Sequence, residues 1–354
     1  MTGRPAIAVL GAGSWGTALA IHLAGNGHPV TLWGHRPQHL RQLAATRTNP
    51  AHLPGITLPD AVQPEADLTG AILRCDELIL ATPSHAMGDM LTHLAALPTP
   101  PTRIMWTCKG FEHGSGRFFH QLARQTLPDL QACACLSGPT FAGEVARGLP
   151  TAMTVGADDT PFANQIARWF ASPTFRVYTS TDLIGVQLGG AVKNILAIAA
   201  GIADGLGFGA NSRSALITRG LVEIIRLGET LGARVDTLMG LSGLGDLVLT
   251  CTDNQSRNRR YGLAIGRGAN PQAAAHAIGQ TIEGLSAARA VRHLMQQHDI
   301  DMPISHLVAC IVFDALPPRA AVNALFQRDI KPEDRMADGA GSAHAADHAV
   351  TGQS

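Results

Sequence analysis

The stretch VLGAGSWGTALA, residues 9–20, decides the fold class. Gly11, Gly13 and Gly16 follow a short apolar run and open a helical pattern that ends at Gly25 and Gly27. Glycines at this spacing permit a tight turn and let a diphosphate approach backbone N–H groups at a helix N-terminus. Because the motif follows the first expected strand, it favours a dinucleotide site over a turn whose glycines serve packing alone.

Outward from this motif, short apolar runs alternate with helical patterns through the first half of the chain. The expected strands are residues 6–11, 29–34, 76–83, 102–110, 132–139, 151–157 and 175–182. Such alternation indicates a mostly parallel, doubly wound sheet. We therefore expect an α/β, Rossmann-type domain over residues 1–183 and an all-helical domain over residues 184–330. The composition of residues 331–354 predicts a disordered tail.

Composition argues against several classes of protein. The 27 Lys and Arg residues balance 27 Asp and Glu residues, whereas a nucleic-acid-binding domain is usually basic. The six cysteines show no Cys-x-x-Cys spacing, so we expect no metal site. The longest apolar segment, residues 188–210, is interrupted by Lys193 and Asp204, which argues against a membrane span. We expect a soluble cytoplasmic protein without nucleic-acid binding or membrane insertion.

The end of the second expected strand carries His35 and Arg36. A strict NAD site places Asp or Glu there to hold the ribose 2′-hydroxyl. Arg36 could pair with a 2′-phosphate, which a carboxylate would repel. The alternative is a surface pair that touches no ligand. The pattern favours NADP (as NADPH), and NAD remains possible.

Lys193 stands in the middle of an Ala-, Ile- and Leu-rich helical segment. Lysine is costly to bury unless it is paired or used. Partial burial, or a nearby cation such as Lys109, would bring its pKa toward the range of a proton donor. The alternative is a lysine whose stem lies along the helix and whose ammonium reaches the surface. Asp246 is either a helix cap or the carboxylate that orients Lys193.

The segment CTDNQSRNRRYG, residues 251–262, is the most basic short stretch of the chain. We expect Asp253 or Asn254 to cap a helix, so that Ser256, Arg257 and Asn258 fall in its first turn. Free N–H groups, the positive helix end and a guanidinium would then point the same way. This pattern predicts a phosphate site.

Two further arginines, Arg259 and Arg260, follow in the same segment. Adjacent helical residues diverge by roughly 100°, so they cannot all share the face of Arg257. We expect one or both to form intramolecular pairs. A nucleic-acid backbone is an alternative partner for the cluster, but the neutral chain and the absence of interleaved aromatic residues argue against it.

Long motifs along the chain resemble one family. They are GAGSWGTALA, PSH (residues 83–85), CKGFE, SGPTFAGE, GVQLGGAVKN, GLGDLVLTCTDNQSRNRR and EG (residues 283–284). Together they cover nearly everything except the tail, and they closely resemble the bacterial NAD(P)-dependent glycerol-3-phosphate dehydrogenases. The resemblance implies an oxidoreductase that reversibly reduces dihydroxyacetone phosphate to sn-glycerol 3-phosphate, the backbone precursor of phospholipids. It also implies a homodimer.

The resemblance also implies the site residues. Beside the glycines, the implied cofactor contacts are Ser14, Trp15, His35, Arg36, Lys109, Ala142, Arg257, Thr281 and Glu283. The implied substrate contacts are Lys109, Gly138, Thr140, Lys193, Asp246, Ser256, Arg257 and Asn258. Lys193 corresponds to the catalytic proton donor and acceptor, with Asp246 and Lys109 beside it. A related dehydrogenase acting on a hydroxy acid, or a regulatory cofactor sensor, would be the alternative.

Overall fold

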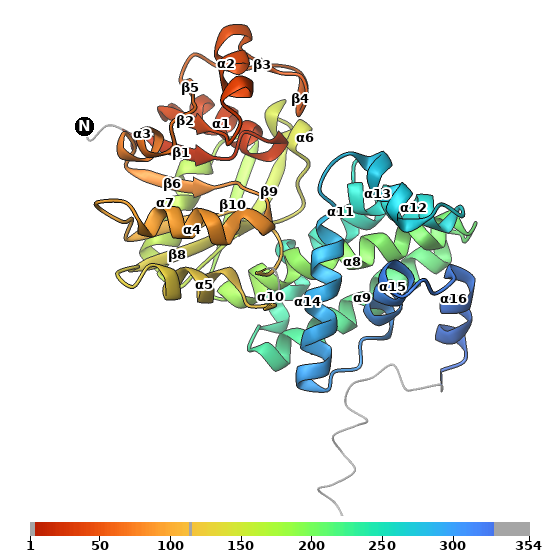
Figure 1. The fold of residues 1–354 in the computed structure, drawn as a ribbon. Helices are drawn as coiled ribbons and strands as arrows, with labels where there is room; N and C mark the ends of the chain where they lie inside the picture. Colours follow the sequence, from red (N-terminus) through yellow and green to blue (C-terminus); the bar gives the residue numbers. More distant parts are fainter. Residues whose placement is uncertain (1–3, 113–114, 329–354) are drawn as a thin grey trace, which may run out of the picture.

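The computed structural model describes residues 4–112 and 115–328, and its first half is built on an eight-stranded sheet (Figure 1). The strand order is β10-β9-β8-β7-β6-β1-β2-β5, and every neighbouring pair is parallel except β8 with β9. The strands are β1 (Ile7–Leu10), β2 (Val30–Trp33), β5 (Val62–Glu65), β6 (Glu77–Leu80), β7 (Arg103–Trp106), β8 (Ala132–Ser137), β9 (Thr151–Ala157) and β10 (Phe175–Ser180). This confirms the predicted mostly parallel sheet.

Helices cover both faces of the sheet, because the apolar strands are buried on both sides. In β1, Ile7 and Val9 belong to one core, and Ala8 and Leu10 belong to the other. The first core takes residues from α1 (Ser14–Gly25), α2 (Pro37–Thr46), α6 (Ala142–Ala146) and α7 (Thr160–Phe170). The second takes residues from α3 (Leu68–Leu73), α4 (Met87–Ala95) and α5 (Phe119–Thr126). The sheet is therefore doubly wound, as predicted.

Three strands were not predicted. The edge strand β5 has the sequence VQPE, and its proline is tolerated because it lies at the edge of the sheet. A separate two-stranded hairpin joins β3 (Thr48–Asn49) to β4 (Leu53–Thr57). These segments lack an apolar run, so their strand character comes from pairing with distant residues.

From Leu183 to Phe326 the chain is helical. The helices are α8 (Leu183–Gly205), α9 (Ala210–Leu231), α10 (Val235–Met239), the π-helical turn η2 (Leu241–Gly245), α11 (Asp246–Thr252), α12 (Arg257–Gly266), α13 (Pro271–Ile278), α14 (Glu283–His298), α15 (Pro303–Phe313) and α16 (Pro318–Phe326). The Asp182 side chain caps α8 by accepting a hydrogen bond of 2.8 Å from the Gly185 N–H.

Helix α8 is the centre of the helical half, and α9, α11, α12, α14 and α15 pack around it (Figure 1). We predicted that no segment is long and apolar enough to cross a bilayer, which is wrong for α8 by length and composition. However, 94% of its most apolar window is buried inside the protein, as in a core helix.

Glycines let α8 and α12 approach with their backbones in contact. A Cβ atom on Gly201 would lie 2.1 Å from the Arg259 carbonyl oxygen, and one on Gly262 would lie 2.0 Å from that of Ile198. No larger residue fits at either position without moving a helix. This contact fixes the N-terminus of α12 relative to Lys193 on α8. The disorder predicted for residues 331–354 lies outside the described residues.

Candidate active site

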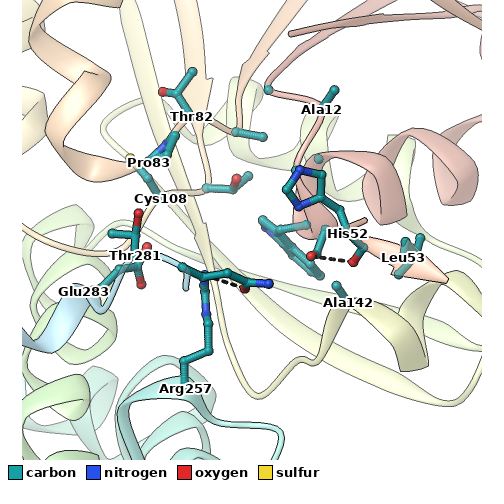
Figure 2. A pocket seen from close by; sticks show the side chains of 18 of the residues that line it. Ala12, His52, Leu53, Thr82, Pro83, Cys108, Ala142, Arg257, Thr281 and Glu283 are labelled. Carbon is teal, nitrogen blue, oxygen red and sulfur yellow. Dashed lines mark hydrogen bonds between the residues drawn. The ribbon is translucent and has the colours of Figure 1, made fainter. Parts of the chain in front are cut away.

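A cleft of about 1080 Å³ lies between the sheet and the helical half. All the predicted cofactor contacts line it: Gly11, Gly13, Ser14, Trp15, Gly16, His35, Arg36, Lys109, Ala142, Arg257, Thr281 and Glu283. Six of the predicted substrate contacts also line it: Lys109, Thr140, Lys193, Ser256, Arg257 and Asn258. The other two, Gly138 and Asp246, lie behind the lysines and accept hydrogen bonds from them. Figure 2 shows side chains from both halves of the chain around this cavity.

The loop between β1 and α1 keeps side chains away from the N-terminus of α1. A Cβ atom on Gly16 would lie 1.8 Å from the Gly11 carbonyl oxygen, so this position tolerates only glycine. Gly11 has φ +137°, a conformation that favours glycine. Gly13 is the N-cap, and no side chain caps the helix there. The first-turn N–H groups are thus available to an anion, which fits the diphosphate of a dinucleotide.

The end of β2 places Arg36 at the cofactor end of the cleft. Arg36 is the N-cap of α2, and its Nη2 lies 3.2 Å from Nε2 of His52, in the loop between β3 and β4. Both side chains line the cleft, as does His35. The surface is therefore basic at the position where a strict NAD site has a carboxylate that holds the ribose hydroxyl.

At the other end of the cleft, two lysines share one carboxylate. Asp246 is fully buried at the start of α11, and its Oδ1 accepts a hydrogen bond from Lys193. Its Oδ2 lies 2.5 Å from Nζ of Lys109, in the segment after β7. Lys193 also donates to Thr250 Oγ1 at 2.8 Å. The alternative of a surface lysine is wrong, because Lys193 is only 5% exposed.

The N-terminus of α12 faces these lysines, but its cap differs from the prediction. Ser256 is the N-cap, with Oγ accepting a hydrogen bond of 3.2 Å from the Arg259 N–H. Asp253 instead accepts from the Gln255 N–H at 2.7 Å, in a turn that precedes the helix. The prediction of Asp253 or Asn254 as the cap is therefore wrong, because this turn delays the start of the helix.

Comparisons with known proteins agree with this geometry. Residues 6–163 match the family described as NAD-dependent glycerol-3-phosphate dehydrogenase N-terminus, and residues 182–323 match the corresponding C-terminus. The chain belongs to the NAD-dependent glycerol-3-phosphate dehydrogenase family.

Relatives with this activity in their names cover nearly the whole chain. The glycerol-3-phosphate dehydrogenase [NAD(P)+] of Methylococcus capsulatus is 52% identical over 93% of this chain and 99% of its own. That of Thioalkalivibrio sulfidiphilus is 51% identical over 93% and 99%. The crystal structure of glycerol-3-phosphate dehydrogenase from Coxiella burnetii superposes with a TM-score of 0.88 at 44% identity, over 92% of this chain and 99% of that one. These results confirm the predicted family and fold.

Within this glycerol-3-phosphate dehydrogenase family member, Arg259 and Arg260 differ in their surroundings. Arg259 is 8% exposed, pairs with Asp204 of α8, and donates to the Cys251 carbonyl at 3.1 Å. This confirms the predicted intramolecular pair for Arg259. Arg260 is exposed and lines the cleft near Arg257, one turn along the same helix.

Sequence reasoning missed a buried amide chain beside Lys193. Asn258 Nδ2 donates to Asn194 Oδ1 at 2.8 Å, and the Gly284 N–H donates to Asn258 Oδ1 at 2.9 Å. It also missed Thr250, although the spacing of four residues from Asp246 on one helix was a usable signal. His52 gave no signal, because its hairpin was not predicted.

Burial and charge act oppositely on the two lysines. Burial lowers the pKa of Lys193 to about 8, with repulsion from Lys109 adding to it and attraction to Asp246 opposing it. Burial also acts on Lys109, but Asp246 and Glu283 outweigh it and raise the pKa of Lys109. Two ammonium groups on one carboxylate leave a positive charge, and Lys193 gives up its proton more easily because its side chain is less exposed (7% against 15%).

Proposed function

We propose that this chain catalyses the NAD(P)H-dependent, reversible reduction of dihydroxyacetone phosphate to sn-glycerol 3-phosphate. The observation that carries the proposal is the Lys193–Asp246–Lys109 cluster, which faces the N-terminus of α12 at one end of a cleft. The glycine loop lies at the other end. We assign dinucleotide binding to residues 1–183 and substrate binding to residues 184–330.

The charge of the cleft supports anionic ligands. Its lining contains two carboxylates, Asp89 and Glu283, and six basic side chains: Arg36, Lys109, Arg147, Lys193, Arg257 and Arg260. The whole chain is neutral, with 27 residues of each sign. The positive charge is thus concentrated where a dinucleotide and a phosphorylated triose would bind.

Lys193 is the proposed general acid in the reduction. A reduced nicotinamide cofactor held at the glycine loop would supply the hydride for the substrate carbonyl carbon. Lys193 Nζ donates a proton to the carbonyl oxygen, and Asp246 holds the ammonium in place. Lys109 adds positive charge where the oxygen becomes negative. In the reverse reaction, neutral Lys193 accepts the proton from the alcohol.

The first turn of α12 is the proposed site for the substrate phosphate. Ser256, Arg257 and Asn258 line the cleft at this turn, and the proposed phosphate ligands are its N–H groups, the Arg257 guanidinium and the Ser256 hydroxyl. Asn258 is held by Asn194 and Gly284, which fixes this turn beside Lys193. Binding the phosphate tightly uses energy remote from the reacting carbon to position the carbonyl.

For the cofactor we propose NADPH over NADH, because Arg36 stands where an NAD site carries a carboxylate. A cytoplasmic homodimer remains our proposal from the family resemblance.

Steady-state oxidation of NADPH and NADH with dihydroxyacetone phosphate tests both the proposed substrate and the proposed cofactor preference. We expect turnover with this substrate and none with a 2-oxo acid such as pyruvate, which lacks the phosphate. The opposite substrate preference would contradict the proposed reaction. In Arg36→Ala, we expect the preference for NADPH to shrink, while unchanged discrimination would remove Arg36 from the cofactor site.

A further inference from the structure

The loop that joins β3 to β4 brings a histidine to the cofactor end of the cleft. Ser14 Oγ donates a hydrogen bond of 2.6 Å to the His52 carbonyl oxygen. Asn49, which is 1% exposed, donates through Nδ2 to the Ala12 carbonyl at 3.1 Å and to Thr17 Oγ1 at 2.8 Å. These bonds fasten the hairpin to the glycine loop. In Figure 2 the His52 ring points from this loop toward the cavity near Ala12.

The charged groups around the His52 ring are basic. Arg36 Nη2 lies 3.2 Å from His52 Nε2, and the His39 ring packs edge-on with 5.3 Å between ring centroids. The positive charge of Arg257 of α12, on the opposite wall of the cleft, also lowers the pKa of this ring. Glu144 of α6, the short helix that contacts β4, bonds instead to the loop before α12.

This arrangement disfavours a charged imidazole until an anion enters. A guanidinium cannot accept a hydrogen bond, so the Arg36 contact requires an unprotonated His52 Nε2. Burial, followed by His39, Arg36 and Arg257, lowers the pKa of His52. A phosphate monoester carries up to two negative charges and three acceptor oxygens, and it would reverse this balance.

We infer that His52 is a specificity-determining residue that binds the 2′-phosphate of NADPH together with Arg36 and takes up a proton as the phosphate binds. The inference rests on the proposed function and adds a second basic group to Arg36. The proton passes from solvent to Nε2 of His52, whose N–H then donates to a phosphate oxygen. NADH has a hydroxyl at this position, so it induces no such uptake.

The inference predicts how cofactor preference depends on pH. The free imidazole has a lowered pKa, and the bound phosphate raises it. Between these two values, the contribution of His52 to NADPH affinity falls as the pH rises, by at most about tenfold per pH unit. Its contribution to NADH affinity stays constant.

Calorimetric titration of the full chain with NADPH and with NADH tests the inference. Repeating each titration in buffers of different ionisation enthalpy counts the protons taken up. We compare the wild type with His52→Gln and with His298→Gln, a control at the exposed end of α14. We expect His52→Gln to lose the extra proton uptake with NADPH and to bind NADPH about tenfold more weakly, the scale of one charge-assisted hydrogen bond. Its NADH affinity should match that of the control.

Four outcomes would overturn the inference. Proton uptake that persists in His52→Gln, or an equal loss of affinity for both cofactors, would show that His52 does not recognise the phosphate. A wild type that binds both cofactors equally would overturn the proposed NADPH preference and this inference with it. Discrimination between NADPH and NADH that is unchanged in His52→Gln would overturn the role of His52 alone. If His52→Gln does not fold, His52→Phe keeps the ring packing and is titrated in its place.

Discussion

At one end of the cleft, the loop between β1 and α1 offers backbone N–H groups and keeps side chains away. At the other end, α8, α11 and the segment after β7 bring three charged side chains into contact, with Lys193 and Lys109 lining the cleft and Asp246 behind them. A larger side chain at the glycine loop would fill the space meant for a ligand. Truncation of a side chain in the lysine cluster would leave a buried charge without its partner. The two ends should therefore fail in different ways.

The largest effect should come from the lysine end. We expect Lys193→Ala to lower kcat by about 10²- to 10⁴-fold, the scale of a lost general acid. The affinity for NADPH should change little, because the glycine loop is untouched. Single-turnover kinetics and cofactor titration on the folded variant measure the two quantities. Turnover close to that of the wild type would remove Lys193 from the reaction.

At the glycine end, two glycine-to-alanine substitutions distinguish a steric clash from the loss of a glycine cap. Gly16→Ala places a Cβ atom 1.8 Å from a backbone oxygen, so we expect a loss of about 3 kcal/mol in the free energy of unfolding. Gly13→Ala meets nothing within 4 Å and should cost about 0.5–1 kcal/mol, the loss of a glycine cap. Denaturant unfolding of both variants checks this, and equal losses would contradict it.

A pair of arginines on α12 sharpens the comparison within the lysine end. Arg257 lines the cleft, so Arg257→Lys should raise the KM for dihydroxyacetone phosphate about tenfold, as one charged hydrogen bond is lost. Arg259 is buried against Asp204, so Arg259→Lys should lower the Tm instead. The KM and the Tm are measured for both variants. The same change in KM and Tm in both variants would contradict the separate roles of the two arginines.

The smallest effect is the pH dependence of the wild type. The pKa of Lys193 is about 8, so the ammonium form needed for reduction predominates below that pH. The kcat/KM for reduction, which reports the pKa of the free enzyme, should fall by half at about pH 8 and by up to tenfold per unit above it. Oxidation of glycerol 3-phosphate needs the neutral amine, so its kcat/KM should rise toward the same pH and then level off. Profiles of both directions provide the check, and a reduction rate that rises through pH 8 would be inconsistent with Lys193 as the acid.

Sequence alone predicted the features that depend on local patterns. The glycine spacing and the apolar runs gave the sheet, because a buried parallel strand needs both. Lys193 stood out because a lysine within an apolar helix is rare without a partner. The role of Asp246 was left open between a helix cap and the carboxylate that orients Lys193. The structure places Asp246 on both lysines through contacts 53 and 137 residues apart in sequence.

What escaped prediction depends on contacts distant in sequence. The strand β5 owes its conformation to β2, and its own sequence contains a proline. The hairpin around His52 is held to the glycine loop by two hydrogen bonds, one from Asn49 to the Ala12 carbonyl and one from Ser14 to the His52 carbonyl. The cap of α12 moved to Ser256 because Asp253 formed a turn of its own.

The backbone contact between α8 and α12 fixes the spacing between two parts of the proposed substrate site. Gly201 and Gly262 bring the two helices together without intervening side chains. A side chain can change rotamer to absorb a small shift, but touching backbones have no such adjustment. The interval between the proposed proton donor on α8 and the proposed phosphate site on α12 is therefore rigid. With the proposed roles, a rigid interval would favour a carbon chain of one size, so the two glycines would help to select the substrate without touching it.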